Sequence, residues 1–243
     1  MSTENQPEIV LYDLACVKNF CLSPVVWRIR MILNYKKIPY RTIFIEFPDI
    51  EPTMKAIGLP LPESETKYTV PAIQHVPSNT YMMGSDPIAE FLESTYPEPP
   101  LSIASELGTK IQTQARTAAW LTFRNSVVPR EYHLFSPRSQ EFFRRTREAT
   151  IGQPLEDILK GDREDESWKA IDPEMQKLNT LLLTNSAQGP FILGEQPSYA
   201  DFFIAGLLQC ARTTEESVFQ RLAKYPGFDQ VYNACLPFME KRD

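Results

Sequence analysis

The N-terminal part of the chain alternates between strand-like and helix-like patterns of hydrophobic residues. Residues 8–13 form a short apolar run that predicts a buried strand, and residues 24–35 carry apolar side chains at helical spacing. Proline in the first turn of this second segment favours a helix start, because the N–H it lacks has no partner there. Residues 40–47 alternate as a strand, and residues 52–57 predict a short helix that ends at Gly58.

Three further patterns complete this unit. An apolar run at residues 68–75 and a shorter one at residues 81–83 predict two more strands, joined by a polar turn at residues 77–79. Residues 87–96 then predict a closing helix. The predicted order is therefore strand, helix, strand, helix, strand, strand, helix.

The pattern changes at a proline cluster in residues 96–100, through which neither a helix nor a strand continues. Beyond it the strand signals stop, and from Ser105 apolar residues recur at helical spacing. The charged residues 161–167 predict a loop between two helices. We therefore predict two domains, an α/β domain of residues 1–97 and an all-helical domain of residues 103–243.

Composition narrows the function classes. With 243 residues, 42% hydrophobic and 23% charged, the chain has the balance of an ordinary folded protein. A net charge of -6 argues against nucleic-acid binding, which needs a surplus of Lys and Arg. No apolar run approaches the roughly 18 residues of a membrane span, and the polar start carries no apolar core, so we expect a cytoplasmic protein with no membrane contact.

Cysteine and histidine usage predicts no metal site. The four cysteines show neither metal-ligand spacing nor a disulfide framework, so free thiols are expected. The two histidines are isolated in the sequence. The residues concerned are Cys16, Cys21, Cys210, Cys235, His75 and His133.

The sharpest candidate for chemistry is Ser23, which directly precedes Pro24 at the predicted helix start. Free backbone amides and the helix dipole at such an end favour negative charge, so a bound thiolate would be stabilised there. A free thiol has a pKa of about 8.5, and lowering it by about two units needs roughly 2.7 kcal/mol. A simple N-cap is the alternative role, and the commoner one for serine.

Three other segments stand out. Pro71, at the head of an apolar strand, predicts a sheet edge or a cis turn, and a cis bond would free the main chain of Val70 for a peptide-like ligand. Ser85 opens the closing helix and offers a second anion site. Ser198 and Asp201 form a capping box, to which we assign a structural role.

In this order and spacing, these features resemble the cytosolic glutathione transferase superfamily over nearly the whole chain. Residues 23–33 resemble the zeta class, the maleylacetoacetate isomerases, which share the Trp-Arg-x-Arg sequence; the omega class has Cys where Ser23 stands. Residues 33–52 resemble fungal transferases related to bacterial beta-etherases. The resemblance implies a thioredoxin-like domain, a helical bundle and a homodimer.

The resemblance also implies roles for single residues in binding glutathione. Ser23 would hydrogen-bond the sulfur, Val70 before cis-Pro71 would pair with the cysteinyl backbone, and Ser85 would hold the γ-glutamyl carboxylate. Lys55 is the candidate for the glycine carboxylate.

One position departs from the family. Gly84 stands where the family usually has an acid that meets the γ-glutamyl ammonium group. Asp86 or a residue of a partner subunit is the expected substitute, and weaker glutathione binding is the alternative.

Two rival nucleophiles and a pocket wall complete the prediction. Cys21 would form a mixed disulfide with glutathione, whereas Tyr12 ends a strand, where an aromatic residue is more often core. The second substrate is expected between the Ser23 loop and the first long helix of the helical domain. The candidate wall residues are Trp120, Phe123 and Arg124.

The predicted function is activation of glutathione for addition to an apolar electrophilic small molecule. A stable adduct gives a conjugate, whereas addition, bond rotation and elimination give cis–trans isomerisation of a conjugated alkene. Fungal secondary metabolism is the suggested setting. Two alternatives stay open: a ligand carrier on the same fold, which Gly84 favours, and a Cys21-dependent thiol transferase.

Overall fold

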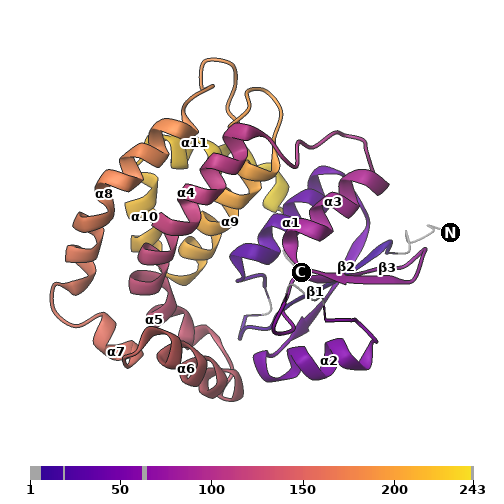
Figure 1. Cartoon of the computed structure of the whole chain (residues 1–243), viewed down its shortest axis with the longest axis horizontal. Helices are drawn as coiled ribbons and strands as arrows, with labels where there is room; N and C mark the ends of the chain where they lie inside the picture. The colour runs from indigo at the N-terminus through magenta and orange to yellow at the C-terminus, as the bar shows by residue number, and fades with distance from the viewer. Residues whose placement is uncertain (1–6, 19, 62–64, 242–243) are drawn as a thin grey trace.

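The computed structural model describes residues 7–18, 20–61 and 65–241. Figure 1 shows a sheet-containing half on the right and a helical half on the left. This arrangement confirms the predicted fold class.

A four-stranded mixed sheet organises the N-terminal half. Its strands, in the spatial order β2-β1-β3-β4, are β1 (Ile9–Leu14), β2 (Tyr40–Ile45), β3 (Ala72–His75) and β4 (Thr80–Met83). β1 pairs in parallel with β2 and antiparallel with β3, and β3 pairs antiparallel with β4. All six residues of β1 are buried, as expected for a central strand that is covered on both faces.

Helices cover both faces of this sheet. α1 (Pro24–Tyr35) and α3 (Ser85–Thr95) lie on one face, and α2 (Ile50–Ala56) lies on the other (Figure 1). Alternate residues of β1 point to opposite faces, so Ile9 and Leu11 join the core beneath α1, whereas Val10 and Tyr12 join the core above α2.

The helical half is built around one buried helix, α9. It contacts α1, α4, α10 and α11 along its length. The elements are α4 (Glu106–Thr122), the π-helical η2 (Phe123–Val127), α5 (Val128–Glu131), η3 (Tyr132–Leu134), α6 (Pro137–Ile151), α7 (Leu155–Ile158), α8 (Arg163–Leu182), α9 (Tyr199–Thr214), α10 (Glu216–Ala223), α11 (Pro226–Cys235) and η4 (Leu236–Met239).

The capping box predicted at the start of α9 is present. The Asp201 carboxylate is fully buried and accepts hydrogen bonds from the Ser198 amide and the Ile192 amide, both at 2.8 Å. The Ser198 hydroxyl donates to the same carboxylate at 2.6 Å. This network supports the structural role assigned to it from the sequence.

Most predicted elements are found within a few residues of their expected bounds, with two clear differences. The predicted strand at residues 68–75 begins only at Ala72, after the cis Val70–Pro71 bond. The predicted loop at residues 161–167 is wrong from Arg163 onward, where α8 begins. The acidic residues that suggested a loop occupy the first turn of α8. Their negative charges interact favourably there with the positive end of the helix dipole.

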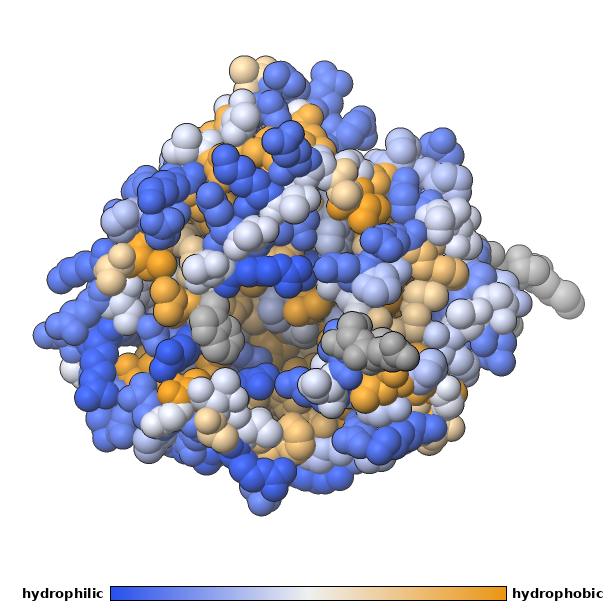
Figure 2. Space-filling model, in the orientation of Figure 1, coloured by the Kyte–Doolittle hydropathy of each residue, from blue (hydrophilic) through white to orange (hydrophobic). Residues whose placement is uncertain are grey.

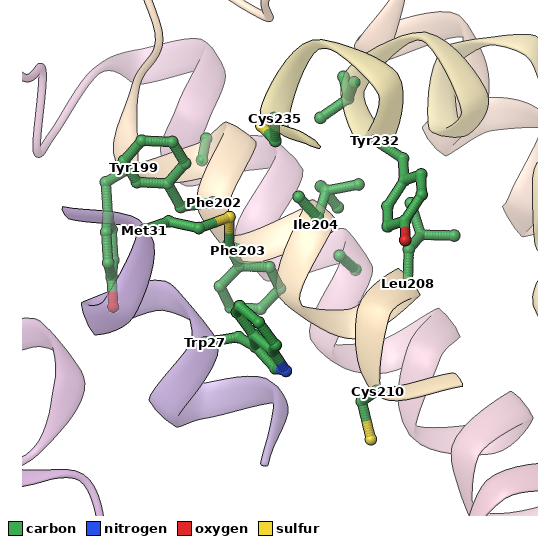
Figure 3. Packing of buried hydrophobic residues seen from close by; sticks show 14 of the residues in the cluster. Trp27, Met31, Tyr199, Phe202, Phe203, Ile204, Leu208, Cys210, Tyr232 and Cys235 are labelled. Atoms are coloured by element: carbon green, nitrogen blue, oxygen red, sulfur yellow. The ribbon is translucent and has the colours of Figure 1, made fainter. Parts of the chain in front are cut away.

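The two halves meet where α1 packs on α9. Figure 3 shows Trp27 and Met31 of α1 facing Tyr199 and Phe203 of α9. At Gly206 the backbones approach so closely that a Cβ atom would lie 2.6 Å from the carbonyl oxygen of Pro24. The contact therefore holds the N-terminal end of α1 against the helical half.

Within the described residues, each helix falls short of the combined length and apolar character that a membrane crossing requires.

Candidate active site

A cavity of about 1010 Å³ lies between the two halves. Figure 2 shows a hollow near the middle of the face, with hydrophobic residues inside and hydrophilic residues around its rim. From the sheet half the lining includes Ser23, Lys55 and Val70, and from the helical half it includes Phe123 and Phe203. Such a mostly apolar cleft with a few polar groups is typical of a site for a small organic molecule.

Ser23 caps α1 and also faces this cavity. Its backbone is extended, and its hydroxyl oxygen accepts a hydrogen bond from the Val26 amide at 3.4 Å. The N-cap interpretation is therefore confirmed. Because a serine hydroxyl accepts and donates at once, its proton stays available to a ligand in the cavity.

The Val70–Pro71 bond is cis, as one of the two sequence interpretations expected. Val70 lines the cavity, and the carbonyl oxygen of Pro71 accepts a hydrogen bond from the Gly84 amide at 3.0 Å. Among the described residues, the main chain of Val70 forms no backbone hydrogen bond. Its amide and carbonyl groups therefore have no main-chain partner in this part of the structure.

Ser85 and Asp86 open α3 just outside the cavity lining. Gly84 precedes them with φ 95°, a left-handed value that favours glycine. The Asp86 carboxylate accepts hydrogen bonds from the Tyr199 hydroxyl at 2.7 Å and from the Ser85 hydroxyl at 3.3 Å. Its second oxygen lies 3.6 Å from Arg116, which does line the cavity. Asp86 is thus tied to the helical half.

Lys55 lines the cavity and is exposed, and its ammonium group lies 2.6 Å from the Glu51 carboxylate. Lys67 lines the same region, although the sequence analysis did not single it out. Its position three residues before Val70 was the available signal. Two cations therefore stand near the Val70 segment.

Cys21 lies behind the site and outside the cavity lining. Its side chain is fully buried, and its thiol is 3.7 Å from the carbonyl oxygen of Ser23. Burial raises the pKa of the Cys21 thiol well above its ordinary value, and the nearby Asp13 carboxylate adds to that rise. These surroundings oppose a reactive thiolate at Cys21. Tyr12 is buried in the core above α2, the role that is commoner for a strand aromatic.

Of the predicted wall residues whose side chains the structure describes, one lines the cavity and one does not. Phe123 lines it, at the start of the π-helical η2. Arg124 is outside the lining and instead donates to the carbonyl oxygen of Ile151 at 3.2 Å, so its prediction as a wall residue is wrong. Trp120 lies in α4, but its side chain is outside the described part of the structure.

The two arginines of the Trp-Arg-x-Arg sequence have different surroundings. Arg30 is fully buried and forms an ion pair with Asp13 at 3.0 Å. Arg28 lines the cavity and is only 5% exposed, with its guanidinium carbon 3.9 Å from the centre of the Phe203 ring. Burial lowers the pKa of Arg28, and its Nε atom has no hydrogen-bond partner among the described residues. Arg30 is thus part of the core and Arg28 part of the site.

A group of polar residues in the helical wall was missed by the sequence analysis. Glu131, Arg147 and Cys210 all line the cavity, from α5, α6 and α9 respectively. Burial raises the pKa of Glu131 to about 7, and Arg147 partly opposes that rise. They come from three separate helices, so no local motif signals them.

Comparison with known proteins identifies the family. The model of the glutathione S-transferase N-terminal domain matches residues 18–100, and that of the C-terminal domain matches residues 110–226. A relative from Aspergillus flavus, the glutathione S-transferase-like protein ustS, is 31% identical over 236 residues. The match covers 90% of this chain and 85% of that protein.

Solved fungal structures are similar over nearly their full length. Glutathione transferase GSTFuA3 from Phanerochaete chrysosporium is 28% identical, with a TM-score of 0.83 and coverage of 97% of this chain and 98% of that one. CsGST83044 from Ceriporiopsis subvermispora, solved in complex with glutathione, is 27% identical, with a TM-score of 0.82 and coverage of 95% and 97%. The chain therefore belongs to the glutathione S-transferase family.

Proposed function

We propose that this protein is a glutathione transferase that ionises the glutathione thiol beside Ser23 and adds the thiolate to an electrophile in the apolar cavity. The observation that carries the proposal is the position of Ser23, at the N-terminal end of the 12-residue α1 and in the wall of a cavity lined by both halves. The first turn of α1 contains no acidic side chain that would compete with an anion.

With the glutathione sulfur beside Ser23, the other parts of the tripeptide can be assigned to neighbouring residues. The main chain of Val70 is open to the cysteinyl backbone, and the N-terminal end of α3 with Ser85 suits the γ-glutamyl carboxylate. Asp86 is the acid for the γ-glutamyl ammonium in place of Gly84, and Lys55 suits the glycine carboxylate. The glutathione complex of the related Ceriporiopsis protein supports glutathione as the ligand.

Two reaction outcomes share the first step. If the adduct is protonated and released, glutathione is consumed and the product is a conjugate. If the adduct rotates and eliminates the thiolate, glutathione is regenerated and the product is a geometric isomer. We further propose a homodimer, as the family resemblance implies, in the cytoplasm, and a role in fungal secondary metabolism. The relative from Aspergillus flavus supports a fungal setting.

A ligand carrier without turnover is the second candidate. The absence of an acid at Gly84 favours it, because the γ-glutamyl ammonium then relies on Asp86, which already meets Tyr199 and Arg116. Glutathione binding separates the two candidates. A transferase binds glutathione measurably, whereas this carrier does not.

The test combines calorimetry with conjugation of 1-chloro-2,4-dinitrobenzene in the wild type, Ser23→Ala and Cys21→Ser. We expect Ser23→Ala to keep glutathione bound but to raise the pKa of its thiol by about one to two units, with an activity loss of roughly 10- to 100-fold near neutral pH. Cys21→Ser serves as the control and should change activity by less than about threefold, because the Cys21 thiol is buried. Absence of heat at millimolar glutathione contradicts the proposal and favours the carrier.

A further inference from the structure

The helical wall of the cavity carries a carboxyl group that thiol activation at Ser23 does not use. Glu131 is the last residue of α5, the short helix that directly follows the π-helical η2 (Phe123–Val127). Phe123, Val128 and Glu131 all line the cavity, so this irregular stretch turns several side chains toward it. Single turns of π-helix are often found at functional sites.

Glu131 has no fixed partner in the described structure, in which its carboxylate forms neither a hydrogen bond nor an ion pair. The adjacent Arg130 is engaged elsewhere, with two hydrogen bonds to Glu164 at 3.0 and 2.8 Å. Arg147 of α6 acts electrostatically on Glu131, and Glu131 in turn helps to raise the pKa of the Cys210 thiol of α9. A pKa of about 7 leaves a large share of this carboxyl group protonated at neutral pH.

Glu131 and Ser23, the residue beside the proposed thiolate position, line the same cavity. A Cβ atom added at Gly206 of α9 would lie 2.6 Å from the carbonyl oxygen of Pro24, the residue after Ser23, so α9 passes close to the start of α1. Cys210 is one helical turn further along α9, a rise of about 6 Å, and it interacts with Glu131. Because Ser23, Cys210 and Glu131 line one cavity, a small molecule held there can meet both the thiolate and this carboxyl group.

We propose that Glu131 donates a proton to the substrate carbon that gains electrons when the glutathione thiolate adds to a conjugated carbonyl compound. This inference rests on the proposed function and names its substrate class. A sulfur lone pair forms the bond to the β-carbon, and the π electrons of the double bond move to the α-carbon as an enolate. Glu131 then transfers its proton to the α-carbon and becomes a carboxylate, which the Arg147 guanidinium stabilises.

Water returns the proton that the glutathione thiol released on ionisation, so the net reaction adds S–H across the double bond. Protonation removes the enolate before the adduct can rotate and eliminate the thiolate. Proton transfer from Glu131 therefore favours conjugation over isomerisation.

The decisive variant is Glu131→Gln, tested on two substrates. Addition to 4-phenyl-3-buten-2-one needs a proton on carbon, whereas 1-chloro-2,4-dinitrobenzene loses chloride and needs none. We expect kcat/KM for the enone to fall by roughly 100-fold, within the usual range for a lost general acid, and the rate for the arene to change by less than about threefold. Glu131→Asp keeps a carboxyl group and should recover part of the enone activity.

The pH dependence of kcat/KM separates proton donation by Glu131 from a purely structural role, which would leave this dependence unchanged. For the wild-type enzyme, kcat/KM for the enone should fall as pH rises above about 7, the value at which Glu131 loses its proton. The arene reaction and Glu131→Gln should lack this falling limb. The matched control Glu141→Gln, an exposed acid on α6, should leave both reactions unchanged.

Equal losses on both substrates, or a falling limb that persists in Glu131→Gln, overturn the assignment to Glu131 while the transferase function stands. Wild-type protein that binds no glutathione and converts neither substrate overturns the proposed function, and this inference with it.

Discussion

At the residue scale, burial decides which charged groups of this protein belong to the core and which belong to the site. Arg30 is buried with a carboxylate partner, Asp13, so its charge is compensated inside the sheet half. Arg28 and Glu131 face the cavity without an ion-pair partner among the described residues. An ionisable side chain that faces a cavity without an ion-pair partner can form a hydrogen bond or an ion pair with a bound ligand.

Glu131 should make stability depend on pH in a predictable direction. Its pKa is raised from 4.5 to about 7 in the folded protein, so the folded state binds the extra proton. The contribution of Glu131 to the free energy of unfolding is therefore fully present below about pH 4.5. It is lost as pH rises through about 7, by up to about 3 kcal/mol. Glu131→Gln should unfold at higher urea than the wild type at pH 8 but at equal urea at pH 4. A difference of the same size at both pH values would contradict this prediction.

At the element scale, the packing of α1 on α9 sets the position of Ser23. A close backbone contact at Gly206 and the facing aromatic side chains of Trp27 and Phe203 fix the two helices together (Figure 3). The capping box of Ser198 and Asp201 in turn fixes where α9 begins. The helix end that holds the proposed thiolate is thus held by the helical half.

Gly206→Ala tests this coupling. The added Cβ would lie 2.6 Å from the carbonyl oxygen of Pro24 and 3.3 Å from the Cβ of Trp27, so the backbone of α1 must shift. We expect a net loss of about 1–3 kcal/mol in the free energy of unfolding, although alanine is the better helix former by about 1 kcal/mol. Urea denaturation measures the loss. A variant as stable as the wild type would show that the contact is not needed.

The helix and strand patterns are predictable from the sequence where the local signal is strong, and less so where it is mixed. The bounds of α1 are reproduced because proline and the apolar spacing act together. The start of α8 was missed because acidic residues in a first helical turn resemble a polar loop in composition. The π-helical η2 was missed because it depends on packing and carries no sequence signature of its own.

At the scale of the whole molecule, the site exists only because the two halves lie against each other. The cavity is lined by residues of both the sheet half and the helical half. A ligand that bridges both halves in the folded state, and is absent from the unfolded state, must stabilise the whole protein.

Glutathione should therefore raise the melting temperature. At about 100 times its dissociation constant, the stabilisation is roughly 2.7 kcal/mol, which corresponds to an upward shift of about 5–10 °C for a protein of this size. Differential scanning fluorimetry measures the shift. Cysteinylglycine, which lacks the γ-glutamyl group that Ser85 and Asp86 are proposed to hold, should give a smaller one. Equal shifts with both thiols would remove these two residues from the binding site.

Features that depend on neighbouring residues can be predicted from the sequence: the order of strands and helices, Ser23 at the start of α1, and the capping box of α9. These follow from hydrophobic period and from the unsatisfied amides at helix ends, which act over a few residues. The packing of the helices places Arg28, Glu131 and Cys210 in one cavity and leaves Cys21 and Arg124 outside its lining. Burial and charge at those positions come from helices far apart in the chain, so their chemistry arises only when the two halves pack together.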